Sequence, residues 1–169
     1  MTIDQAALGS AMKAVVAAAH ADDEAALYQA VMPPAGTDTP PAEVTAWFGT
    51  LLVHLALTVA MTSELERGCP REAVSEWIEE VLGPRPTPAL LRAADPGRID
   101  HVEAVNAAAE YARCHEYTVD LVRLGLTDPD EAPDERGVEA HCAATNDSRT
   151  RITVIAMLGR LSAAPGGRA

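Results

Sequence analysis

The segment from Ala46 to Thr62 is almost entirely apolar, and it limits how this chain can fold more than any other feature. Its apolar residues occupy every side of a helix instead of one stripe, which is typical of a helix packed all round. The segment follows Pro41, and proline is favoured in the first turn of a helix. The pattern therefore predicts a helix over Pro41–Glu66, with Trp47–Met61 as a central buried section.

A membrane-spanning helix is the alternative interpretation of this segment. A helix needs about 20 mostly apolar residues to cross a bilayer. The run is shorter, it contains His54 and three threonines, and it lacks flanking basic residues that would set an orientation. We therefore expect a core helix and no membrane partner.

The rest of the chain shows helical periodicity interrupted by prolines and glycines. Further helices are predicted at Ile3–Ala19, Leu27–Met32, Arg71–Leu82, Ile99–Leu124, Val138–Thr145 and Ser148–Leu161, with a single turn at Leu90–Leu91. In the segment Ile99–Leu124 one apolar face is expected to hold Val102, Val105, Ala108, Ala112, His115, Val119 and Val122. These patterns predict an all-α fold: a single-domain helical bundle of six to eight helices over residues 1–162, with a flexible tail at 163–169.

Charge excludes some classes of partner. The chain has 25 acidic residues against 13 basic ones, a net charge of −12, which disfavours nucleic acids. Three cysteines without a C-x-x-C spacing fit a reducing compartment, so a cytoplasmic location is expected.

The basic residues gather at the end of the sequence. No acidic residue follows Asp147, whereas four arginines do. A basic final helix can dock on the acidic remainder of its own chain, with Ile152, Ile155, Leu158 and Leu161 buried. Alternatively, Arg149 and Arg151 meet an acidic patch on another copy, which would give a homo-oligomer.

Motifs for catalysis and cofactor binding are not found in the sequence. The Glu-x-x-His pair of dinuclear carboxylate sites does not occur, nor does a phosphate-binding glycine loop. His115-Glu116 begins like H-E-x-x-H, but Val119 holds the place of the second histidine. Glu76 and Glu79 resemble half of the magnesium site of all-α nucleotide pyrophosphohydrolases, and the Glu-x-x-Asp half on a second helix is missing. No cofactor, metal or catalytic residue is predicted.

Polar residues interrupt the apolar stripes of both long helices. His54 lies in line with Thr58, and His115 in line with Tyr111. If the two helices ran antiparallel with their midpoints aligned, these four residues would meet in the interior. A buried histidine can act as an acid, base or ligand near neutral pH, or can be a neutral core residue.

Two functions of different classes follow from the sequence. The first is a helical protein-interaction or regulatory module that pairs with a second copy or with another protein. The second is a small-molecule-binding protein or enzyme with its polar site between the two long helices, at His54, Thr58, Tyr111 and His115.

Overall fold

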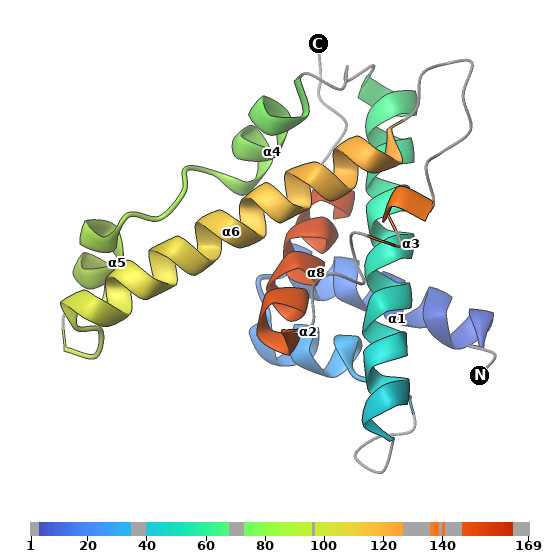
Figure 1. Cartoon of the computed structure of the whole chain (residues 1–169), viewed down its shortest axis with the longest axis horizontal. Helices are drawn as coiled ribbons and strands as arrows, with labels where there is room; N and C mark the ends of the chain where they lie inside the picture. Colours follow the sequence, from blue (N-terminus) through green and yellow to red (C-terminus); the bar gives the residue numbers. More distant parts are fainter. Residues whose placement is uncertain are drawn as a thin grey trace.

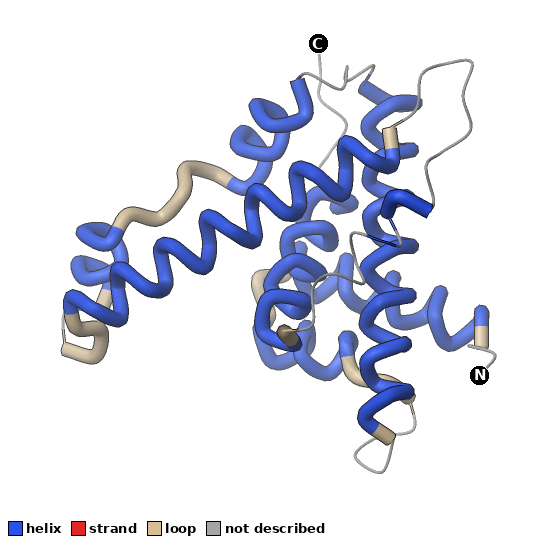
Figure 2. The backbone as a smooth tube through the Cα atoms, viewed as in Figure 1, coloured by secondary structure: helices blue, strands red, loops and turns tan. Residues whose placement is uncertain are grey.

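Figures 1 and 2 show the fold in a computed structural model, which describes residues 4–34, 40–67, 73–95, 97–126, 136–138, 140 and 147–163. The helices are α1 (Gln5–His20), α2 (Glu24–Val31), α3 (Pro41–Arg67), α4 (Val74–Leu82), α5 (Pro88–Ala94), α6 (His101–Gly125) and α8 (Ser148–Ala163). No strand occurs among these residues. The predicted all-α bundle is confirmed. Of the predicted helix Val138–Thr145 only Val138 and Ala140 are described, and both are helical.

Several helices begin at an acidic or hydroxyl residue whose side chain caps the first turn. Asp23 accepts a hydrogen bond from the backbone N–H of Ala26, and Asp147 accepts from Thr150. Before α6, Asp100 and Glu103 form a reciprocal capping box. Each cap satisfies a backbone donor that the first turn of a helix leaves free.

The helix α3 supplies the largest group of core side chains. Its buried apolar residues are Trp47, Phe48, Leu51, Leu52, Leu55, Ala56, Val59 and Ala60. The expectation that α3 is buried on every side is wrong, however, because Thr58 is exposed and Met61 is 54% exposed. Among the described residues, no helix covers the side of α3 that carries Thr58 and Met61.

The helix α8 packs against α1, α2, α3, α4 and α6, and therefore lies at the centre of the helix contacts (Figure 1). Its buried residues include Ile155, Leu158 and Leu161, while Ile152 is partly buried, as the intramolecular docking hypothesis requires. Arg149 pairs with Glu110 of α6 at 3.2 Å. Docking of the basic helix within its own chain is thus what the structure shows.

The first half of α6, together with α5, extends away from the other helices (Figures 1 and 2). We call residues Pro88–Arg113 the arm. The apolar face predicted for this helix is only partly buried, because the Val102 and Val105 side chains are 64% and 41% exposed whereas His115 and Val122 are buried. The periodicity is helical as predicted, but no described helix lies over this part of the stripe.

Two glycines allow helices to approach closely. A Cβ added at Gly125 would lie 2.8 Å from the Cβ of Ala60, so the end of α6 meets α3 nearly backbone to backbone. A Cβ at Gly159 would lie 3.0 Å from the Cβ of Ala19 on α1. A larger residue at either position must push two helices apart.

We expect Gly125→Val to lower the free energy of unfolding by about 1–3 kcal/mol, the usual cost of overpacking a core. Urea unfolding measures this change. Gly9→Ala is the matched control, because a Cβ at Gly9 meets nothing within 4 Å. Alanine there should raise the free energy of unfolding by about 0.5–1 kcal/mol. Equal stability of Gly125→Val and the wild type would contradict the close packing of α6 on α3.

Candidate functional site

Tyr111 and His115 form the polar pair that the structure brings together from the predicted site. They lie one turn apart on α6, with ring centroids 6.5 Å apart and planes inclined by 34°. Tyr111 is partly buried and His115 fully buried. Burial raises the pKa of the Tyr111 hydroxyl, an effect that the positive charges of Arg160 and Arg85 oppose.

His115 is a buried polar group without a visible partner. Neither ring nitrogen has a hydrogen-bond partner among the described residues. Burial lowers the pKa of His115, and the nearby Arg85 guanidinium lowers it further. The ring is therefore neutral near pH 7, with one donor nitrogen and one acceptor nitrogen in the interior.

A pocket of about 320 Å³ lies beside Tyr111, between the α1–α2 connection, α4, α6 and α8. Its polar lining includes Tyr111, Thr153 and Arg160, and its apolar lining includes Leu82 and Met157. This volume lies within the range of about 300–1,000 Å³ that is common for small-ligand sites. The pocket reaches Tyr111 but not His115, which lies one turn further along α6, and we take the pocket with this tyrosine as the candidate functional site.

An ion pair closes one side of this pocket. Arg160 of α8 donates to the carboxylate of Asp22, in the connection between α1 and α2. Asp22 has a φ of 55°, a left-handed conformation that aspartate tolerates better than most residues. The ion pair joins the end of α1 to α8, and it gives the pocket a charged rim.

His54 and Thr58 lie elsewhere, so the predicted four-residue site is not formed. The end of α6 contacts α3 at Ala56 and Ala60, which means that the midpoints of the two helices are not aligned. The Nδ1 of His54 lies 2.9 Å from the carbonyl oxygen of Thr50, one turn earlier on the same helix. Thr58 lines a different depression, between α1, α3 and α8.

The two arginines predicted to meet another copy have different environments. Arg149 is exposed and pairs with Glu110 of its own chain. Arg151 is only 4% exposed, and one of its Nη atoms donates to the carbonyl oxygen of Thr45 at 3.3 Å. Arg151 is therefore not part of an accessible surface, and this part of the predicted interaction site is corrected.

Arg160, Asp22 and Arg85 lie near Tyr111 and could not be identified from the sequence. These residues come from three distant segments and carry no shared motif, so only the tertiary fold could identify them. Cys114, next to His115, is buried, and burial raises the pKa of its thiol above the ordinary value. It is a poor nucleophile for that reason.

Two further features of the structure concern membranes and metal ions. The segment Pro41–Ser63 of α3 is long and apolar enough to cross a bilayer, and 44% of its apolar 18-residue stretch is buried inside the protein. Core helices of soluble proteins can have the same length and composition. Among the described residues no group of three or more histidine, cysteine or acidic side chains could hold a metal ion.

Comparison with known proteins adds no functional assignment. No protein family matches the chain, and no curated protein or solved structure is significantly similar to it. The chemistry of the described residues is therefore the basis for the proposals below.

The buried imidazole predicts a pH-dependent stability. Because the pKa of His115 is lowered on folding, the unfolded chain binds this proton more readily than the folded chain does. The part of the folding stability that depends on a neutral His115 is complete above about pH 6.5, the ordinary pKa of histidine, and is lost as the pH falls below this value.

We expect His115→Leu to lose less stability than the wild type between about pH 7.5 and about pH 5.5, because the variant has no buried group to protonate. Urea unfolding at both pH values measures the difference. At the higher pH the variant should be as stable as the wild type or more so, since leucine leaves no unpaired nitrogen in the core. Identical pH dependence in the two proteins would show that His115 is not held in its neutral form by folding.

Proposed function

We propose that this protein is a helical interaction module that pairs with a second copy of itself through the arm. The observation that carries the proposal is the exposure of Val102 and Val105 on α6. With Ala109 and Ala112 they follow spacings of three and four residues, which place all four on one side of a helix. Such a stripe is apolar enough to receive another helix.

The arm has little core of its own. No residue of α5 is buried, and Ala104 is the one fully buried residue of α6 before Cys114. Leu90 on α5 is 58% exposed. Short helices without buried apolar contacts are marginally stable in water, so association at the arm would stabilise it.

Charge favours a second copy as the partner. The arm carries three arginines and four acidic residues, so it is nearly neutral in a chain with a net charge of −12. Two arms can therefore approach with less repulsion than other faces of the protein. Pairing of identical surfaces about a two-fold axis is the commonest arrangement of homodimers.

An antiparallel pairing of two α6 helices fits the sequence of the stripe. If Val105 lies opposite Ala109 of the second copy, Val102 lies opposite Ala112. Small residues opposite valines let the two backbones approach closely. The same register places the start of α6, which the exposed Arg98 precedes, beside the exposed Glu116 of the second copy, whose carboxylate also pairs with Arg85 of its own chain at 3.8 Å; opposite charges therefore lie at both ends of the interface.

We expect the wild type to show a mass that rises toward twice the chain mass with concentration in sedimentation equilibrium. Val102→Asp should remain a monomer at the same concentrations, because it buries a carboxylate against the apolar stripe. Met61→Asp is the matched control, since Met61 is similarly exposed but lies on α3 outside the arm. This variant should associate as the wild type does.

A charge exchange tests the register. Arg98→Glu should weaken association, and adding Glu116→Arg should restore it, with both effects reduced at high salt. A wild type that is monomeric at every concentration would contradict self-association. If Glu116→Arg does not restore the association that Arg98→Glu weakens, and both variants are folded, the antiparallel register is contradicted but self-association is not.

A second candidate function is small-molecule binding beside Tyr111. The pocket of about 320 Å³ favours it, with the Tyr111 hydroxyl and the Arg160 guanidinium in its lining. A bound organic mass in native mass spectra should be lost in Tyr111→Phe, which removes one hydroxyl and leaves the ring that packs near His115. Retention of the same mass by the variant would place the ligand elsewhere.

A further inference from the structure

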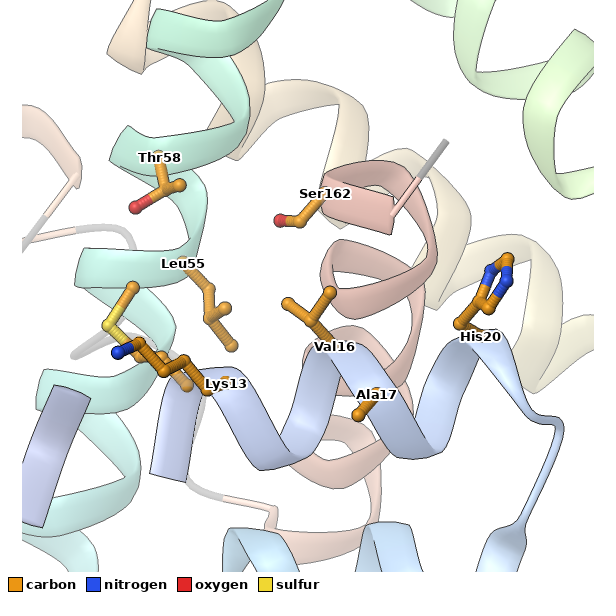
Figure 3. A pocket seen from close by; sticks show the side chains of 8 residues that line it. Lys13, Val16, Ala17, His20, Leu55, Thr58 and Ser162 are labelled. Carbon is orange, nitrogen blue, oxygen red and sulfur yellow. The ribbon is translucent and has the colours of Figure 1, made fainter. Parts of the chain in front are cut away.

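A second depression lies between α1, α3 and α8 (Figure 3). Its volume is about 520 Å³, and we call it the α1 groove. Half of its eight lining residues are apolar, namely Met12, Val16, Ala17 and Leu55. The groove is therefore suited to an alkyl chain, whose transfer from water is favourable by about 0.8 kcal/mol for each buried CH₂ group.

The polar groups of the groove are few. The hydroxyl of Thr58 donates to the carbonyl oxygen of His54 at 2.7 Å, and that of Ser162 donates to Leu158 at 2.9 Å. Both hydroxyl protons are thus used within their own helices. The groove lining contains no carboxylate.

Lys13 gives the groove a fixed positive charge. It is the single lysine of the chain, it is exposed, and it forms no ion pair with any residue that the structure describes. Figure 3 shows its side chain beside the apolar lining, with His20 two turns further along α1. In a protein of net charge −12 this groove is a place where an anion meets an unpaired cation instead of acidic side chains.

We propose that the α1 groove binds a free aliphatic carboxylate, with the alkyl chain along Val16 and Leu55 and the carboxylate at Lys13. An apolar lining without a charge would accept any alkane-like molecule. A lining with an acidic residue would favour an amine. The combination of an alkyl-sized apolar groove and one ammonium group selects a fatty acid.

The experiment is a titration of the full chain with decanoate, followed by amide NMR, with 1-decanol as the uncharged comparison ligand. Decanoate should cause saturable shifts at α1 residues 12–20 and near Leu55, and it should bind more tightly than decanol. Lys13→Met should weaken decanoate binding by about two- to fivefold, the effect of losing a partly exposed ion pair. The affinity for decanol should not change.

Matched control variants separate the effect of the positive charge from the effect of free volume in the α1 groove. Arg92→Met removes an equivalent charge on α5 and should leave decanoate binding unchanged. Ala17→Trp should block both ligands by filling the groove, whereas Ala14→Trp, also exposed on α1 but outside the lining, should not.

Three outcomes would overturn the proposal. The first is the absence of saturable shifts in the wild type, and the second is an equal loss of decanoate and decanol affinity in Lys13→Met. The third is binding to phosphatidylglycerol vesicles without binding to free decanoate, which would identify a membrane surface as the partner. Shifts at the groove that respond to Ala17→Trp but not to Ala14→Trp support the proposal.

Discussion

The contact between α1 and α8 is the one on which the rest of the structure depends. A Cβ added at Gly159 of α8 would lie only 3.0 Å from side-chain atoms of Val15 and Ala19 on α1. Glycine at this position therefore allows the two helices to approach this closely. Around this contact α8 also packs against four other helices, α2, α3, α4 and α6, and its arginines reach Glu110 on α6 and Asp22 beyond α1. The same helix thus supplies core packing and the docking of opposite charge, and both the pocket beside Tyr111 and the α1 groove are bounded by it.

Much of the fold could be predicted from local sequence. Prolines, glycines and acidic caps fix the helix ends, and for this reason the bounds of α1, α3, α6 and α8 fall within a few residues of those expected. The central role of α8 could not be predicted in the same way. Its sequence is rich in arginine and threonine, and periodicity does not reveal that Arg151 is buried against the backbone of Thr45.

Only the part of the candidate site that lies within one helix could be predicted from the sequence. Tyr111 and His115 meet because they are one helical turn apart on the same helix, a relation that the sequence contains. The expected meeting with His54 required the register between two helices, and close packing at Gly125 sets a different one. Val102 and Val105 show the same limit, because a helical stripe indicates a face but not whether the chain itself covers it.

The order of the helices along the chain has a consequence for synthesis. The buried side of α1 is completed by α8, whose residues leave the ribosome well over a hundred positions later. Until then α1 has α2 and part of α3 as its partners, and these helices lack the core side chains that α8 supplies. Contacts between such distant segments also raise the contact order and slow the search for the native topology. Nascent chains would therefore expose the apolar side of α3 until α6 and α8 have emerged, and exposed apolar surface of this kind favours aggregation.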